Sequence, residues 1–420
     1  MVFERENGLT IFDGAIGTEV QKRSPESSEN LTDLLNLSNP DIVRAIHQDY
    51  LEAGAEFLTT NTFSASEIRL SRSGYEGKSS EINENGARLA KQAIQDLSGA
   101  KTEERLVAGS IGPTGETLFP LGDYTFDQFY NAFHQQAKAL KLGGADWIII
   151  ETMESLRESK AALAAAKEVG LPVISSMSYG EKGRTSFGVV PESGTVTLDR
   201  LGADVLGINC GTGPGSYPDT IKTYHEFTGK PLLAEANAGN PVLKNGRAIY
   251  DLTPERYIQD IQPGLPYLSG VGSCCGSDSS FTRALARIAP EYNSKPGGNK
   301  DEREDFISNN SSVVALSEST DLVEIEIARD ELKDLKDKTV KGKINLINLD
   351  GIPDSKTEIE KKLSRQFLRL RSKKPIGIVT NNPEILTEFL KAYPGIAPVK
   401  TSRNESSINT ISKKYGGLLL

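Results

Sequence analysis

Short β-branched runs alternate with longer segments of helical period from residue 8 to about residue 292. Alternation of this kind predicts strands joined by amphipathic helices, which is the pattern of an α/β protein with a parallel sheet. Eight such pairs can be counted. The expected strands are Thr10–Asp13, Phe57–Thr62, Leu106–Ser110, Trp147–Thr152, Val173–Ser178, Val205–Asn209, Leu232–Ala236 and Tyr267–Ser273.

The clearest helical segment is Asn39–Ala55, where Asn39 is a candidate cap, Pro40 suits the first turn, and apolar residues recur at three- and four-residue steps. The same period predicts helices over Asn131–Leu142 and Leu156–Val169. The fifth helix is the weakest, and a loop is expected over Gly180–Thr197. Eight β/α units in this length predict a (β/α)₈ TIM barrel. An open doubly wound sheet is the competing fold, but no glycine-rich phosphate-binding fingerprint favours it.

The composition changes after Pro290. We expect the barrel to occupy residues 1–292 and a Pro-, Gly- and charge-rich linker to occupy residues 293–305. Residues 306–420 are expected to form a smaller α/β domain. Its predicted strands are Val313–Leu316, Ile344–Leu349 and Ile376–Val379, and its predicted helices are Lys356–Ser372 and Pro383–Ala392.

Composition excludes several classes of protein. The chain has 420 residues and a formal net charge of −9, which argues against a nucleic-acid partner. Its apolar runs are far shorter than the ~20 residues of a membrane span, and its first residues lack the pattern of a signal peptide. Three Cys cannot all pair, which fits a reducing compartment, so we expect a cytoplasmic protein.

All three cysteines fall at the carboxyl ends of predicted barrel strands. Cys210 ends the sixth strand, and Cys274 and Cys275 follow the eighth. Active sites of TIM barrels are built at this rim. Three thiolates there would bind one Zn²⁺ and leave a fourth tetrahedral position open. The alternative is three buried cysteines that act as small apolar residues.

Acidic and amide residues gather at the same rim. Asp13 follows the first strand, Glu151 ends the fourth, Glu235 and Asn237 end the seventh, and Asn61 ends the second. Glu151 is a candidate partner for a substrate ammonium, and the glycine turn after Asp13 is a candidate site for a carboxylate. The alternative is that these acids cap helices or bind loop amides. The three histidines, His47, His134 and His225, fall within helical segments and are expected at the outer surface rather than in catalysis.

Eight stretches together resemble the homocysteine S-methyltransferase domain. They are Phe12–Thr18, Asn39–Ala55 with Thr60–Phe63, Ala108–Thr114, Gly144–Thr152, Gly207–Cys210, Ala236–Pro241 and Gly272–Gly276. The resemblance covers about residues 8 to 292. This domain occurs in cobalamin-dependent methionine synthase and in betaine-using enzymes. The stretch Thr60–Phe63 resembles the methionine synthase branch more than the betaine-using branch.

The resemblance implies a zinc enzyme that moves a methyl group to the thiol of homocysteine and forms methionine. It implies that Cys210, Cys274 and Cys275 are the ligands of one Zn²⁺, that Asp13, Gly14 and Glu151 hold the amino-acid end of homocysteine, and that Asn237 lies beside the metal. Asn61 is also expected at the substrate. The expected methyl donor is a methylated corrinoid protein, carrying methylcobalamin and supplied in trans, with S-methylmethionine or a methylated amine as the alternative.

The C-terminal part more faintly resembles a shortened pterin-binding domain, through Lys374–Pro383, Ala392–Gly395 and Lys413–Gly417. Val379 stands where that family has an acid and Lys400 stands where it has Asn, so a folate site is not expected. A role in docking or in forming a homo-oligomer is the simpler interpretation.

Two other classes of function remain open from the sequence. A barrel glycosidase would use Glu151 and Glu235, which follow the fourth and seventh strands, but it would leave the three rim cysteines unexplained. A non-catalytic partner protein would keep the zinc site for structure alone.

Overall fold

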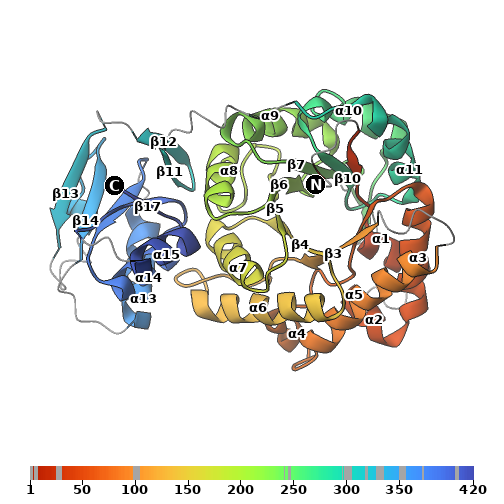
Figure 1. The fold of residues 1–420 in the computed structure, drawn as a ribbon, viewed down its shortest axis with the longest axis horizontal. Coiled ribbons are helices and arrows are strands. Elements are labelled where there is room, and N and C mark those ends of the chain that lie inside the picture. Colours follow the sequence, from red (N-terminus) through yellow and green to blue (C-terminus); the bar gives the residue numbers. More distant parts are fainter. Residues whose placement is uncertain are drawn as a thin grey trace.

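The computed structural model describes residues 3, 8–24, 31–97, 105–240, 242–244, 247–295, 297, 305–316, 320–327, 335–349, 356–370, 373–402 and 406–420. Within these residues, two bodies of secondary structure lie side by side, a large barrel and a smaller C-terminal region (Figure 1).

Eight parallel strands form the barrel, in the spatial order β1-β10-β7-β6-β5-β4-β3-β2. A bridge between Phe12 and Phe57 joins the first strand to the last and closes the sheet. The predicted TIM barrel is confirmed, and each expected strand is present at its place in the sequence. The strands are β1 (Thr10–Ile11), β2 (Phe57–Thr59), β3 (Leu106–Ile111), β4 (Trp147–Met153), β5 (Val173–Met177), β6 (Val205–Asn209), β7 (Leu232–Ala236) and β10 (Gly270–Ser273).

The lower part of the barrel interior is apolar. Ile149 and Leu233 lie there with the stacked rings of Phe12 and Phe57, whose centroids are 4.5 Å apart. Side chains alternate between the two faces of a strand, so the residues two positions further on face the same interior. Glu151 and Glu235 occupy those positions, at the carboxyl ends of β4 and β7. The alternation of side chains along the strands therefore places the carboxylates of Glu151 and Glu235 at the mouth of the barrel, above its apolar lower interior.

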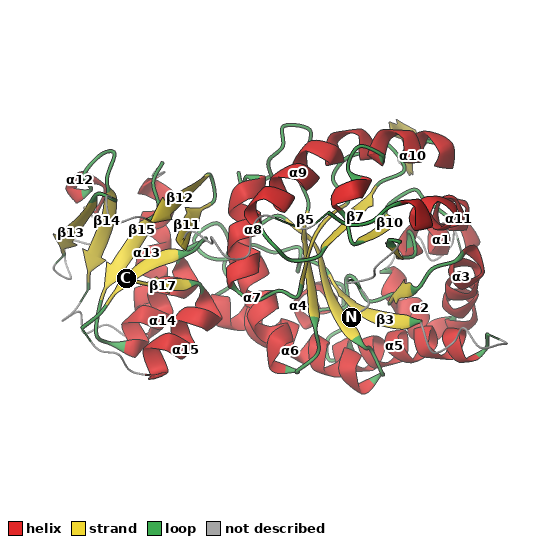
Figure 2. Cartoon of the chain, turned by 45° about the horizontal axis from the view of Figure 1, so that its top comes forward, coloured by secondary structure: helices red, strands yellow, loops and turns green. Residues whose placement is uncertain are grey.

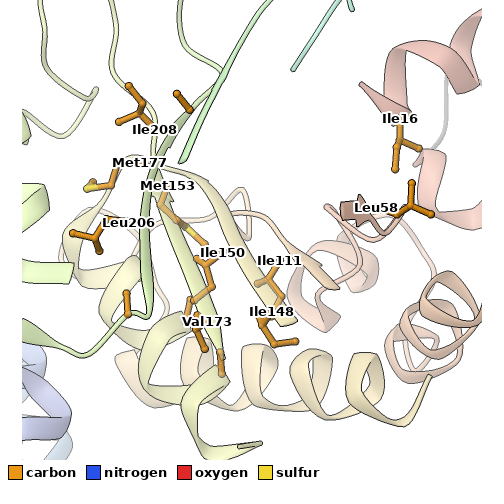
Figure 3. Packing of buried hydrophobic residues seen from close by; sticks show 14 of the residues in the cluster. Ile16, Leu58, Ile111, Ile148, Ile150, Met153, Val173, Met177, Leu206 and Ile208 are labelled. Atoms are coloured by element: carbon orange, nitrogen blue, oxygen red, sulfur yellow. The ribbon is translucent and has the colours of Figure 1, made fainter. Parts of the chain in front are cut away.

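Helices surround the sheet, and their apolar faces cover its outer surface (Figures 1 and 2). Figure 3 shows part of this packing, in which Ile148, Ile150 and Leu206 are buried between strands and helices. The helices are α1 (Ile16–Arg23), α2 (Leu35–Ser38), α3 (Pro40–Ala53), α4 (Glu67–Arg72), α5 (Ser79–Gln95), α6 (Phe126–Leu142), α7 (Leu156–Glu168), α8 (Pro191–Arg200), α9 (Tyr217–Phe227), α10 (Pro254–Ile261) and α11 (Ser279–Ile288), with 3₁₀ turns at Thr32–Leu34, Pro214–Ser216, Leu265–Tyr267 and Ala289–Glu291. A hairpin of β8 (Val242–Lys244) and β9 (Arg247–Ile249) follows β7.

The loop expected over Gly180–Thr197 is wrong in its second half, where α8 begins at Pro191. The buried face of α8 is made largely of small polar residues, so it lacks the apolar period that identifies a helix in a sequence. Gly194 is required by close packing. A Cβ at this position would lie 2.3 Å from the hydroxyl of Tyr179.

The C-terminal region is a five-stranded parallel sheet, in the order β13-β14-β15-β16-β17, with a separate antiparallel hairpin. The three predicted strands and two predicted helices are present, and further elements were missed. The region contains β11 (Asp305–Asn309) and β12 (Ser312–Leu316), which form the hairpin, β13 (Leu322–Glu326), α12 (Leu335–Lys338), β14 (Ile344–Asn348), α13 (Lys356–Leu370), β15 (Ile376–Val379), α14 (Pro383–Ala392), β16 (Ala397–Lys400), α15 (Ser406–Tyr415) and β17 (Gly417–Leu419).

The C-terminal region packs against α7 and α8 of the barrel (Figure 1). Lys160 of α7 is fully buried there, and its Nζ donates to the carbonyl oxygens of Leu390, Tyr393 and Gly395 at 2.8, 2.8 and 3.2 Å. These carbonyls lie at and just after the carboxyl end of α14, where a cation is favoured by the helix dipole. A barrel side chain thus caps a helix of the C-terminal region.

Two smaller expectations are corrected or limited by the structure. His47 is not at the surface, because α3 turns it into the barrel core, where it is fully buried. Much of the predicted linker 293–305 lies outside the described residues, and its last residue, Asp305, already belongs to β11.

Val379 and Lys400 are paired at the ends of β15 and β16. Among the described helices, none is both long enough and apolar enough to cross a bilayer.

Candidate metal centre and amino-acid site

The three cysteines meet at the mouth of the barrel. Their Sγ atoms all lie within 4.8 Å of one another, and those of Cys210 and Cys275 are 3.9 Å apart. Two sulfurs at ~2.3 Å from one tetrahedral zinc would be about 3.8 Å apart. The thiols are free and half-buried, and no other group of three metal-binding side chains occurs in the described part of the chain. The spacing therefore suits a shared metal ion.

Both cysteine loops are attached to the end of β7. The backbone N–H of Cys210 donates to Glu235 O at 3.0 Å, and that of Cys274 donates to Ala236 O at 2.7 Å. Cys210 has a φ of 56°, a left-handed conformation that is costly for a side chain larger than glycine. The next residue, Gly211, has no room for a Cβ, which would lie 2.3 Å from Tyr179 O. This turn fixes the direction in which the Cys210 thiol leaves β6.

The trio favours a thiolate even by itself. Hydrogen bonds from the thiols of Cys210 and Cys274 lower the pKa of Cys275 to about 3. Thiolates are the form in which cysteine binds metal ions. Hydrogen bonds to Cys275 and burial raise the pKa of Cys210 and Cys274, so these two thiols would lose their protons only on binding a metal ion.

Glu151 is fixed in place by two neighbours. Ser110 Oγ donates to Glu151 Oε1 at 2.5 Å, and Asn209 Nδ2 donates to Glu151 Oε2 at 3.1 Å. Burial raises the pKa of Glu151 to about 7, while these two hydrogen bonds lower it and the charge of Cys210 raises it. A buried carboxylate of this kind gains most from a cationic partner. The site is therefore suited to an ammonium group.

Asp13 and Gly14 lie beside that carboxylate. Asp13 accepts a hydrogen bond from Thr59 N at 2.8 Å, and burial raises its pKa to about 8. Gly14 is closely surrounded, since a Cβ there would lie 2.8 Å from Ser277 Oγ and 2.9 Å from the Tyr50 hydroxyl. The turn after β1 therefore requires glycine.

The two asparagines predicted at the site differ in their surroundings. Asn237 is buried, and its Oδ1 has no hydrogen-bond partner among the described residues, while the next residue donates from Ala238 N to Cys275 O at 2.9 Å. Asn61 instead uses its amide nitrogen to bind Thr32 O at 2.9 Å and Asn36 Oδ1 at 3.1 Å. Asn237 is the better placed for a ligand, and a substrate role for Asn61 stays a prediction.

Glu235 is the third acid at the mouth. It is buried, and burial together with the charges of Glu151 and Asp13 raises its pKa well above the usual range. Ser110 and Asn209, which hold Glu151, were not among the predicted site residues. The only signal for Asn209 was its position directly before Cys210, and Ser110 had only its place near the end of a strand.

The family model described as homocysteine S-methyltransferase matches residues 10–289 of the chain. The chain belongs to the homocysteine S-methyltransferase family. The matched residues span the whole barrel, including the three thiols and Asp13, Glu151 and Asn237. Membership of this family contradicts the glycosidase hypothesis, in which Glu151 and Glu235 would be the catalytic pair.

Two curated relatives of this family member are methionine synthases. That of Mycobacterium tuberculosis is 28% identical over 291 residues, which cover 66% of this chain and 24% of the relative. That of Mycobacterium leprae is 28% identical over 298 residues, which cover 68% and 24%. The chain therefore matches about a quarter of the length of these relatives.

Solved structures share the barrel. The metallated form of the homocysteine methyltransferase MmuM from Escherichia coli superimposes with a TM-score of 0.57 at 21% identity and covers 67% of this chain and 96% of its own. The oxidized form gives a TM-score of 0.54 at 22% identity with the same coverage. At this identity the likeness confirms the fold.

Proposed function

We propose that this chain is a zinc-dependent methyltransferase that transfers a methyl group to the thiol of homocysteine and forms methionine. The observation that carries the proposal is the meeting of Cys210, Cys274 and Cys275 at the barrel mouth, with thiols within 4.8 Å of one another. Membership of the homocysteine S-methyltransferase family gives it the reaction class.

The donor set fits one Zn²⁺. Three soft thiolates from two loops are a preferred ligand set for zinc, and they leave one tetrahedral position for an exchangeable ligand. When bound, zinc would act as a Lewis acid that lowers the pKa of a thiol entering that position. Three protein thiolates keep the centre anionic, so the substrate sulfur would remain electron-rich.

Homocysteine would be oriented by the acids of the mouth. Its ammonium would face Glu151, which Ser110 and Asn209 hold in position, and Asp13 on the neighbouring turn. These contacts would orient homocysteine with its sulfur toward the three cysteines and would limit the motion of the sulfur before reaction. In the transfer, the sulfur lone pair forms the new S–CH₃ bond as the bond from methyl to donor breaks, and the donor leaves with that electron pair.

We further propose that the donor is a methylated corrinoid protein supplied in trans. The support is the match to two proteins named methionine synthase. The alternative is a small donor such as S-methylmethionine or a methylated amine. Methionine formation from homocysteine with each donor in turn would distinguish the two. A failure with all of them would favour the non-catalytic partner.

Replacing one cysteine tests the metal site. Cys210→Ala should reduce bound zinc from one ion per chain to a small fraction and abolish methionine formation, while circular dichroism keeps the wild-type spectrum. The reason is that this thiol comes from a loop of its own, and two thiols alone bind zinc much more weakly. Glu181→Gln, on the exposed loop after β5, is the matched control and should keep its zinc. Full zinc content in Cys210→Ala would contradict the proposal.

A further inference from the structure

A cavity of about 670 Å³ lies between the barrel rim and the C-terminal region, apart from the site at the barrel mouth. The barrel contributes the loops that follow β3 and β5 and the start of α7, and the C-terminal region contributes the β11–β12 turn and α13. None of the site residues described above lines it. Its volume lies within the range of small-molecule sites.

The walls of this interdomain cavity are largely apolar. Half-buried Phe187 of the barrel and Phe367 of α13 both line it. So do Leu121 and Leu368, which are 59% and 48% exposed and belong to the barrel and the C-terminal region respectively. Large apolar side chains that stay exposed around one hollow are typical of a binding site. The walls suit a ligand with a flat apolar body.

Two polar atoms of the cavity lack partners. Ser364 is 3% exposed, and its Oγ has no hydrogen-bond partner among the described residues. The same holds for Asn310 Oδ1, although Asn310 Nδ2 donates to Phe187 O at 3.3 Å. Buried polar groups are nearly always hydrogen-bonded, so these two oxygens are free to accept hydrogen bonds from a molecule in the cavity.

Several charged side chains around the cavity already have partners within the described residues. Arg157 is buried in an ion pair with Glu360 at 3.0 Å, and Glu158 accepts from Thr114 N at 2.8 Å. Glu116 pairs with Arg72.

Charged groups of both signs lie near the cavity, because the carboxylate of Glu154 accepts a hydrogen bond from the lining residue Ser186. Arg184 is exposed and lines the cavity, and no described residue forms an ion pair with it. Lys361 and Arg365 of α13 lie over the ring of Phe119, at 5.8 and 4.9 Å from its centroid, next to lining residue Leu118. Arg184 is therefore the lining cation available to the acidic group of a ligand.

We propose that the interdomain cavity binds a small organic anion with a flat apolar ring system, whose acidic group faces Arg184 and whose polar atoms meet Ser364 Oγ and Asn310 Oδ1. The inference goes beyond the proposed methyl transfer and does not depend on it. Because both parts of the chain line the cavity, the ligand would bind only when the C-terminal region is packed on the barrel.

The test is a fluorescence titration of the full chain with 8-anilinonaphthalene-1-sulfonate, an aromatic anion of suitable size. We expect saturable binding of one probe per chain. Ser364→Leu should fill the cavity and weaken binding at least tenfold, and Arg184→Gln should weaken it about threefold or more. N-phenyl-1-naphthylamine, which lacks the acidic group, should bind at least tenfold more weakly to the wild-type chain.

Lys222→Gln, which removes an exposed cation of α9 away from the cavity, is the matched control and should bind as wild type does. Thermal unfolding checks that each variant is folded. If Ser364→Leu fails to fold, Arg184→Gln and the neutral probe carry the test. The proposal is overturned by absence of saturable binding, which would mean a cavity filled only with water, by unchanged affinity in both cavity variants, or by equal affinity for the neutral probe.

Discussion

At the scale of single residues, the site depends on side chains that are held in place before any ligand arrives. Ser110 and Asn209 each donate a hydrogen bond to Glu151, and Thr59 N donates one to Asp13. Asn209 Oδ1 also accepts from Thr152 N at 2.7 Å, where the backbone has a positive φ of 59°. The acids of the mouth are therefore fixed by contacts between different strands.

Glu151→Gln should weaken homocysteine binding at least about tenfold with zinc retained. The substitution keeps the shape of the side chain but removes the charge that faces the ammonium, and hydrogen bonds to charged groups contribute roughly 1.5–3 kcal/mol. Isothermal titration of the zinc-loaded chain with homocysteine measures this without a methyl donor. Glu168→Gln, at the far end of α7, should bind as wild type does. Equal affinity in the two variants would remove Glu151 from the substrate site.

His47 should make the unfolding free energy depend on pH. Burial lowers its pKa from 6.5 to about 4, so below pH 6.5 the unfolded chain binds a proton that the folded chain excludes. Stability from this group is therefore complete above pH 6.5 and is lost as pH falls toward 4, by about 2 kcal/mol at pH 5.

Urea unfolding of the wild type and His47→Leu at pH 7.5 and pH 5.0, both with a chelator so that zinc does not contribute, measures this loss. His47→Leu should lose about 2 kcal/mol less than the wild type on acidification. His134→Leu, whose native side chain is 38% exposed, should follow the wild type. Parallel losses in all three proteins would contradict the expectation.

At the scale of elements, α7 serves both parts of the molecule. It begins just after the strand that carries Glu151, and its outer face holds the C-terminal region through Lys160 and Arg157. Arg157 donates to Lys391 O at 3.0 Å and to Phe119 O at 2.7 Å as well as pairing with Glu360. The helix next to the barrel mouth thus also contacts the C-terminal region, together with α8.

Lys160→Met should lower the free energy of unfolding by roughly 2–4 kcal/mol, because it leaves three carbonyl oxygens at the end of α14 without a donor. Lys167→Met on the same helix is the control. Lys167 is partly exposed and donates to Gly202 O, so its loss should cost well under 1 kcal/mol. Urea unfolding compares the two, and similar costs would show that the buried lysine is not a significant attachment.

Sequence reasoning succeeded for elements with a local signal. Most barrel strands are short apolar runs that can be recognised individually, and all eight were found. The predicted strand Tyr267–Ser273 begins too early, because Tyr267 belongs to a 3₁₀ turn and β10 starts at Gly270. It failed for α8, whose buried face is small and polar, and for β13, which alternates exposed acids with apolar residues at the edge of its sheet. The period of 3.6 or 2 is visible only where burial selects large apolar side chains.

At the scale of the whole molecule, contacts between distant residues were the hardest to predict. The meeting of Cys210 with Cys274 and Cys275 was expected from their common place at strand ends and from the family resemblance. Other contacts depend on tertiary packing and leave no pattern in the sequence. They are the hydrogen bonds of the cysteine loops to β7, the hydrogen bond from Asn209 to Glu151, and the capping of α14 by Lys160. The same holds for the interdomain cavity, whose walls come from both parts of the chain.

X-ray absorption spectroscopy at the zinc edge, on the purified chain with and without homocysteine, tests the central claim most directly. We predict one zinc per chain with three sulfur ligands at ~2.3 Å, rising to four sulfurs when homocysteine is added. A chain that takes up no zinc, or zinc whose sulfur count does not change with homocysteine, would contradict the account.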